Sequence, residues 1–125
     1  MASVVRMNLS GSTDGKGINL AATSTPGNLI HTATSSTTPG AGVIWDEIWL
    51  WISYDTLNAL PEVTIEFGDA TAPDHNIRFQ PQYHSTPRLI VAGMILQNST
   101  TVRGFASATL TGNAVVTGYV NRITN

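Results

Sequence analysis

The sequence predicts an all-β fold, a jelly-roll-like antiparallel β-sandwich of about eight strands with an extended N-terminal arm. Two observations lead to this fold class. Stretches in which apolar and polar residues alternate recur along the chain, and a period of two is typical of half-buried strands. The segments between them are short and rich in Gly, Pro, Asn, Ser and Thr, which favour turns over helices.

The 125 residues predict a single domain. Residues 1–17 show little periodicity and are expected to be an N-terminal arm or a loose edge strand, and residues 18–125 form the sandwich. A short helical turn is expected at 55–61, ended by Pro61. The expected strands cover residues 18–23, 28–34, 43–54, 62–67, 76–81, 88–96, 101–110 and 114–123.

Residues 43–54 hold all three tryptophans and are dominated by β-branched and aromatic residues, which predicts a central strand. Alternation places Ile44, Asp46, Ile48, Leu50, Ile52 and Tyr54 on one face, and Val43, Trp45, Glu47, Trp49, Trp51 and Ser53 on the other. Both faces are largely apolar, so both are expected to be covered. The opposing sheet covers one face, and a loop, an arm or a neighbouring subunit covers the other.

The face with the tryptophans supplies the candidate interface residues, which are Val43, Trp45, Trp49 and Trp51. Tryptophan is enriched at buried protein interfaces. Packing inside the chain's own core and a stacking platform for a ligand are the two alternatives that the sequence leaves open. The adjacent carboxylates Asp46 and Glu47 are expected near the end of the strand, where it emerges into water.

The last three strands, at 88–96, 101–110 and 114–123, are expected to be joined as a meander. Residues 88–96 form a continuous apolar run, which predicts a strand buried on both faces. Gly93 within it predicts a β-bulge or a close approach of backbones. Short turn-forming segments at 97–100 and 111–113 are expected to reverse the chain twice.

Composition excludes several classes of function. Six basic and eight acidic residues give a net charge of −2, and the basic residues do not cluster, so nucleic acid is not an expected partner. No cysteine is present, which excludes disulfides and thiolate metal sites. The longest apolar run, 89–96, is too short to span a bilayer. The N-terminus lacks the apolar core of a signal peptide, so synthesis in a cytosol and no membrane partner are expected.

No motif in the sequence indicates a catalytic activity, so a non-enzymatic protein without metal or cofactor is expected. One cluster of polar residues invites a metal or a catalytic interpretation, although solvated loop residues are the simpler reading: Glu66, Asp69, Asp74, His75 and His84. Asp46 and Glu47 point to opposite faces of one strand, so they cannot flank a glycosidic bond together.

Other charged residues are expected to be structural or exposed. Glu62 and Glu66 share one face of their strand and are expected to face solvent. His31 is expected to be a structural residue rather than a ligand. Arg103 and Arg122 are expected at the surface, with their stems covering apolar area.

The segment 88–123, RLIVAGMILQNSTTVRGFASATLTGNAVVTGYVNRI, resembles the carboxyl-terminal part of small β-sandwich virion structural proteins of tailed bacteriophages. These include capsid cement or decoration proteins and head-associated proteins. IVAG, VRGFAS and VTGYVNRI carry the resemblance, which covers roughly the last third of the chain and brings no functional residue with it. It implies a capsid cement protein made in the host cytoplasm and placed on the capsid surface of the virion.

The resemblance also implies the partners, which are further copies of the chain, for example in a trimer, and the major capsid protein or another virion protein. Two other functions remain open at this point. One is a carbohydrate-binding β-sandwich, lectin-like or host-recognising, which the tryptophan row and the polar loops favour. The other is a structural component of the tail or neck of the particle.

Overall fold

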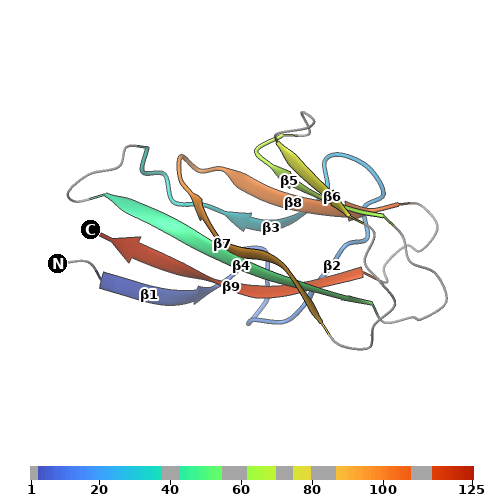
Figure 1. Ribbon diagram of the computed structural model, residues 1–125, viewed down its shortest axis with the longest axis horizontal. Coiled ribbons are helices and arrows are strands. Elements are labelled where there is room, and N and C mark those ends of the chain that lie inside the picture. Colours follow the sequence, from blue (N-terminus) through green and yellow to red (C-terminus); the bar gives the residue numbers. More distant parts are fainter. Residues whose placement is uncertain (1–2, 38–42, 55–61, 70–74, 80–86, 108–113) are drawn as a thin grey trace.

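A computed structural model describes residues 3–37, 43–54, 62–69, 75–79, 87–107 and 114–125, and two antiparallel sheets pack face to face in this part of the chain (Figure 1). Sheet A contains β1 (Ser3–Asn8), β2 (Ile18–Asn19), β4 (Ile44–Tyr54), β7 (Arg88–Leu96) and β9 (Ala114–Thr124). Sheet B contains β3 (Asn28–Thr32), β5 (Val63–Phe67), β6 (Asn76–Phe79) and β8 (Thr101–Ala106).

The order of strands is β1-β9-β4-β7 in sheet A, with β2 also paired to β9, and β3-β8-β5-β6 in sheet B. The pairs are nested along the chain, because β1 and β2 pair with β9, β3 with β8, β4 with β7 and β5 with β6. A long antiparallel ribbon that is rolled into two sheets gives this order, which is the jelly-roll topology. The predicted fold class is therefore confirmed.

Of the two alternatives expected for residues 1–17, the described residues show an edge strand, since residues 3–8 form β1 at the edge of sheet A. The residues after it loop out and rejoin the sheet as β2, which pairs with β9 beyond the end of β1. Figure 1 shows the two chain termini side by side at one end of the molecule. The helical turn expected at 55–61 and the turn expected at 111–113 lie outside the described residues.

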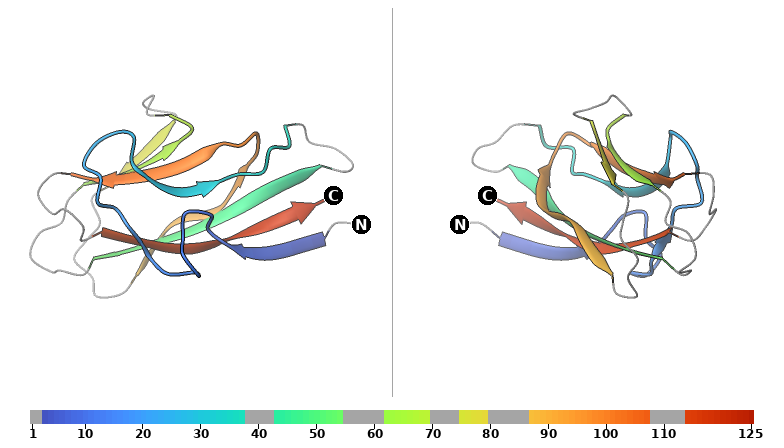
Figure 2. Two further views of the ribbon diagram at one scale, coloured as in Figure 1. Left: turned by 180° about the vertical axis from the view of Figure 1, so that it is seen from behind. Right: turned by 45° about the vertical axis from the view of Figure 1, so that its right-hand side comes forward.

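The predicted meander of the last three strands is wrong. β7 and β9 lie in sheet A, whereas β8 lies in sheet B (Figure 2). The turn at 97–100 does not pair β7 with β8, although Asn98 and Ser99 take positive φ angles of 58° and 53°, which a tight hairpin turn also uses. Their amides donate instead to the carbonyls of Ser36 and Thr34. These bonds hold the turn against the β3–β4 connection and send the chain to the opposite sheet.

β7 is also not the doubly buried strand that its apolarity predicts. It is an edge strand of sheet A, and its side chains Leu89 and Ile95 are 45% and 61% exposed. Gly93 does mark a bulge, because the pairing of β4 with β7 slips there and the φ of Gly93 is 73°. A Cβ at Gly93 would approach the ring of Trp49 to 3.1 Å.

The inner faces of the two sheets form a continuous apolar core. β4 is central in sheet A, as predicted, and its pairing with β9 and β7 buries the alternate residues Ile48, Leu50 and Ile52. The other large buried apolar side chains come from both sheets and from the β1–β3 region, and they are Leu9, Ile18, Leu20, Ile30, Val63, Ile65, Val91, Leu96, Val102, Val116 and Val120.

Gly118 allows the two longest strands to approach closely. It lies opposite Leu50, and a Cβ built on it would stand 2.0 Å from the carbonyl oxygen of Trp49. We predict that Gly118→Ala forces β4 and β9 apart and lowers the free energy of unfolding by about 1–3 kcal/mol. Urea denaturation measures the effect. Thr117→Ala, on the half-exposed outer face of β9, is the matched control and is expected to cost less than about 1 kcal/mol. Equal losses in both variants would contradict the steric explanation.

Candidate interaction surface

The outer face of sheet A, which points away from sheet B, carries all three tryptophans. Directly paired residues of neighbouring strands share a face, so the register defines four cross-strand rows along this face. The rows are Val4–Ile123–Trp45, Arg6–Asn121–Glu47–Ile95, Asn8–Tyr119–Trp49–Ala92 and Thr117–Trp51–Leu89. We call these residues the aromatic face.

Three rings form a cluster at the centre of the aromatic face. The rings of Trp49 and Tyr119 have centroids 6.2 Å apart and an interplanar angle of 18°, and those of Trp51 and Tyr119 are 5.9 Å apart at 34°. The guanidinium carbon of Arg6 lies 4.4 Å from the centroid of the Tyr119 ring, in a cation–π contact. The rings of Trp49 and Tyr119 are therefore nearly parallel, and the Arg6 guanidinium lies over one face of the Tyr119 ring between the two tryptophans.

Sheet B covers the inner face of sheet A, and the aromatic face on the other side remains partly exposed (Figure 2). The rings of Trp45, Trp49 and Trp51 are half-buried. Three of the exposed large apolar residues among the described positions border them, with Val4 and Ile95 61% and Leu89 45% exposed. Exposed apolar residues that are contiguous, rather than scattered, are typical of protein–protein or ligand-binding surfaces.

The indole N–H groups of Trp45 and Trp49 find no acceptor among the described residues, although both nitrogen atoms are buried. An unpaired buried donor costs about 1–3 kcal/mol, so these two N–H groups lower the stability of the folded chain. Val43, the remaining candidate interface residue, is half-buried just before β4, and its carbonyl accepts the Asn125 amide at 2.9 Å. Val43 thus joins the two strand ends.

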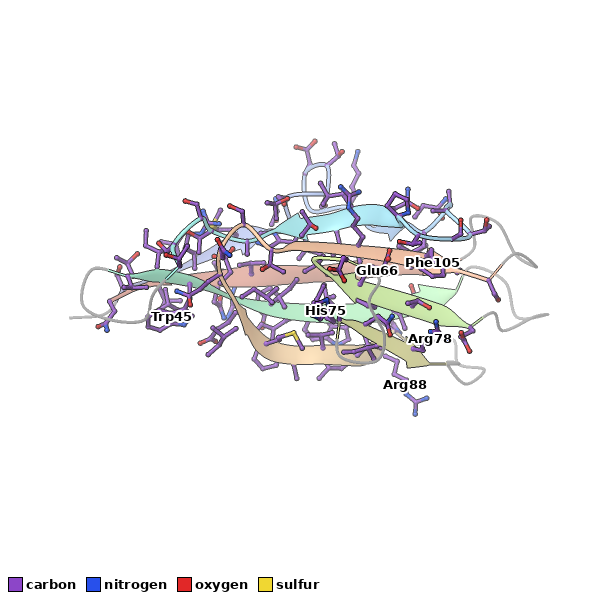
Figure 3. The ribbon with its side chains drawn as sticks, turned by 90° about the horizontal axis from the view of Figure 1, so that it is seen from above. Trp45, Glu66, His75, Arg78, Arg88 and Phe105 are labelled. Atoms are coloured by element: carbon purple, nitrogen blue, oxygen red, sulfur yellow. The ribbon has the colours of Figure 1, made fainter. Side chains whose placement is uncertain are left out.

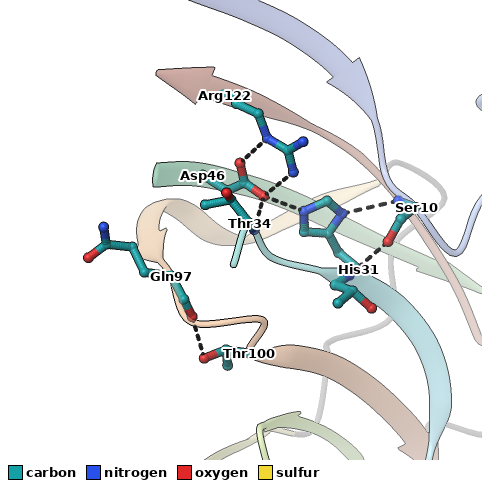
Figure 4. A network of polar contacts seen from close by, with 8 residues as sticks. Ser10, His31, Thr34, Asp46, Gln97, Thr100 and Arg122 are labelled. Atoms are coloured by element: carbon teal, nitrogen blue, oxygen red, sulfur yellow. Dashed lines mark hydrogen bonds and ion pairs between the residues drawn. The ribbon is translucent and has the colours of Figure 1, made fainter. Parts of the chain in front are cut away.

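Asp46 is buried, which corrects the expectation that it emerges into water. Its carboxylate accepts two hydrogen bonds from Arg122, at 2.8 Å from Nε and 3.0 Å from a terminal nitrogen (Figure 4). It also accepts the Thr34 amide at 3.1 Å and meets Nε2 of His31 at 2.8 Å. Asp46 is 0% and His31 1% exposed. Arg122, expected at the surface, is 32% exposed, and its guanidinium also neutralises this buried carboxylate, which the sequence did not predict.

The electrostatics follow from these contacts. Burial raises the pKa of Asp46, but the hydrogen bonds from Arg122 and His31 and the charge of Arg122 lower it by more, so that the pKa lies below its usual 3.8. The Asp46 carboxylate in turn raises the pKa of Arg122. The network ties β3, β4 and β9 together at the end of the sandwich where the chain termini lie.

Ser10, His31 and Asp46 resemble a hydrolase triad only in composition. Nδ1 of His31 accepts the backbone N–H of Ser10 at 3.1 Å, so Nε2 carries the ring proton and donates it to Asp46 (Figure 4). The Ser10 hydroxyl oxygen meanwhile accepts the amide of Thr32 at 2.7 Å. A serine nucleophile needs its hydroxyl to donate to the imidazole, and no atom of His31 is placed to take that proton. The three residues are a structural unit, as expected for His31.

Glu66 is likewise buried rather than solvent-facing, at 3% exposure. Its two carboxylate oxygens accept the Thr25 hydroxyl at 2.6 Å and the Gly27 amide at 2.8 Å. The β2–β3 connection therefore folds over the outer face of sheet B, where Figure 3 shows Glu66 near Phe105. Arg103 also binds this connection, through the Gly27 carbonyl at 3.3 Å. Thr25, Glu66 and Arg103 line a cavity of about 230 Å³.

The polar cluster proposed from the sequence is only partly brought together. Asp69 and His75 pair at 2.7 Å on the surface, while Glu66 is engaged with Thr25 and Gly27. Asp74 and His84 lie outside the described residues. Within the described ranges, no three acidic or histidine side chains are grouped as metal ligands would be.

Sequence reasoning found the tryptophans but missed Tyr119 and Arg6, which complete the aromatic face. Alternation alone places Tyr119 on the same face of its strand as Val115 and Thr117. The missing information was the register, because only the pairing of Trp49 with Tyr119 and of Arg6 with Asn121 brings these side chains together.

Comparisons of the chain with protein-family models, with curated proteins and with solved structures find no match. None of the described segments is a helix that could cross a membrane.

The buried Asp46–Arg122 pair predicts a stability effect that depends on pH. Arg122→Met leaves the buried carboxylate without its cation and is expected to lower the free energy of unfolding by about 3–5 kcal/mol at neutral pH. Because the folded-state pKa of Asp46 is depressed, its contribution is present above the ordinary value of 3.8 and is lost as the pH falls through the folded pKa. The difference between variant and wild type should therefore shrink on acidification.

Urea denaturation at neutral and at acidic pH measures this difference. Arg78→Met, which removes an exposed arginine of β6, is the control and is expected to be near neutral at both pH values. A loss in Arg122→Met that stays constant with pH would show that the ion pair is not its source.

Proposed function

We propose that this protein is a non-enzymatic structural protein of a virion, of the capsid cement or decoration type, which binds protein neighbours through the aromatic face. The observation that carries the proposal is the apolar and aromatic outer face of sheet A, opposite the face that sheet B covers. A folded chain gains little from placing three tryptophans there unless a partner removes them from water.

The composition of the aromatic face is that of a protein interface. Aromatic residues and arginine are enriched in the buried centres of interfaces, and charged residues are depleted there. Among the paired residues of the four rows, only Arg6 and Glu47 are charged. A sheet face is also a rigid platform, so little conformational entropy opposes association.

The setting in a virion rests on two further supports. One is the resemblance of residues 88–123 to small β-sandwich proteins of tailed phages. The other is the jelly-roll topology, an architecture that viral capsid domains and lectins use. Because a fold does not imply a function, this part of the proposal needs its own experiment. An antibody raised against the purified chain should label phage particles from the source culture in immunogold microscopy. Particles that contain the chain in no detectable amount would overturn the virion setting.

A carbohydrate-binding surface is the second candidate, and the aromatic cluster of Trp49, Trp51 and Tyr119 on the partly exposed face favours it. Aromatic rings at a surface can stack on sugar rings. The contact of Arg6 with Tyr119 counts against it, since the guanidinium already takes one face of the central ring. A position in the tail or neck of the particle remains compatible with the same surface.

The protein-interface proposal predicts that Trp51→Ala separates binding from folding. Trp51 is half-buried on the outer face, so we expect the variant to keep the wild-type circular dichroism and lose only about 1–2 kcal/mol of stability. Its partner-dependent association should weaken, as sedimentation velocity would detect. Ile52→Val is the matched control on the inner face of the same strand. We expect it to lower stability by about 0.5–1.5 kcal/mol without affecting association. A Trp51→Ala variant that unfolds would instead make Trp51 a core residue.

The carbohydrate candidate predicts a different response. Glycans that stack on Trp49 and Trp51 should shift the tryptophan fluorescence of the wild type, and the Trp51→Ala variant should lose that shift. A glycan array together with fluorescence titration of its hits makes the measurement. An array without hits removes this candidate and leaves the protein-interface proposal unaffected.

A further inference from the structure

The aromatic face is complementary to itself in charge. Arg6 on β1 and Glu47 on β4 lie in one cross-strand row, on either side of Asn121 of β9. Two strand spacings separate them, roughly 10 Å between backbones, and they form no ion pair with one another. Glu47 has neither a hydrogen bond nor an ion pair to any described residue. Arg6 donates one hydrogen bond, from Nε to the side-chain oxygen of Asn121 at 3.2 Å.

We propose that a second copy of the chain covers the aromatic face, with the two sheets A related by a two-fold axis that runs along β9 between them. This inference rests on the proposed function and names the partner. Such an axis exchanges the two sides of β9 in each row. It therefore places Arg6 opposite the partner's Glu47 and Glu47 opposite the partner's Arg6. The isologous interface thus contains two symmetry-related pairs of opposite charge.

The same operation fits the other rows. Trp45 comes to lie opposite the partner's Val4, which is 61% exposed in the single chain. Trp49 comes to lie opposite the partner's exposed Asn8. On the axis itself, Tyr119 meets the partner's Tyr119. Strands of the two copies then run nearly parallel to one another, as in aligned packing of sheets.

The available area suits a dimer of modest affinity. β4 and β9 have 11 residues each, which gives a length of roughly 36 Å at the rise of a strand. Three strand columns, with β1 and β2 filling the third, give a projected area of roughly 500 Å². Specific interfaces bury about 800 Å² on each partner, and weaker ones less. In an interface of this size, one pair of reciprocal charges should have a measurable effect.

Charge reversal tests the two-fold arrangement. In homodimers of Arg6→Glu, position 6 faces the partner's Glu47, and in homodimers of Glu47→Arg, Arg6 faces another arginine. We expect each variant to raise the dimer dissociation constant at least about tenfold, as sedimentation velocity would show. Mixing the two variants pairs opposite charges at both contacts. The mixture should therefore dimerise within a few-fold of wild type, and so should the double variant R6E/E47R.

The mixture is the decisive sample because the monomers within it are unchanged, so effects inside one chain cancel. If Arg6→Glu fails to fold after losing its contact with Tyr119, a comparison of the Glu47→Arg and Glu47→Gln variants still tests the arrangement. Repulsion predicts that Glu47→Arg dimerises more weakly than Glu47→Gln and that added salt removes this difference.

A wild-type dimer whose mixed variants associate no better than each alone would overturn the two-fold arrangement while the proposed function stands. A wild-type trimer would do the same. A wild-type chain that stays monomeric at high concentration would overturn the second copy as occupant, and labelling of particles by the antibody then decides the proposed function separately.

Discussion

The pairing of β4 with β9 is the constraint on which the rest of the structure depends. These are the two longest strands, and they pair along their whole length in one unbroken register. That register sets Asp46 opposite Arg122 on the inner face and Trp49 opposite Tyr119 on the outer face. A slip of one residue would turn one strand over relative to the other. It would place Trp49 and Tyr119 on opposite faces of the sheet and likewise separate Asp46 from Arg122, so the register, with its close contact at Gly118, fixes core and surface together.

The two faces of sheet A are stabilised by different means. On the inner face, apolar side chains fill the space between the sheets, and at one end Asp46 is satisfied by Arg122, His31 and Thr34. On the outer face, large rings pack on one another without a covering layer from sheet B. This asymmetry links the fold to the proposed function. Sheet A is rigid, one of its faces is covered by sheet B, and its other face is free of sheet B and can bind a partner.

The fold class and the course of β4 could be predicted because alternation of side chains is a local property of the sequence. The buried carboxylates could not, since their partners are distant in the chain. Gly27 is 39 residues from Glu66, and Arg122 is 76 residues from Asp46. An alternating pattern assigns polar residues to solvent, which was wrong for both. The meander failed for a similar reason, because the bonds that redirect the turn at Asn98 come from residues before β4. The aromatic face was half predicted, with its tryptophans found and Tyr119 and Arg6 missed.

The proposed function and the two-fold dimer both require that another chain removes the aromatic face from water. Acrylamide quenching of tryptophan fluorescence at increasing protein concentration tests it most directly, because all three tryptophans of the chain lie on that face. If the aromatic face is the interface, quenching should weaken as the chain associates, and the emission should move to shorter wavelength. Association that leaves the quenching unchanged would place the interface elsewhere and rule out burial of the aromatic face.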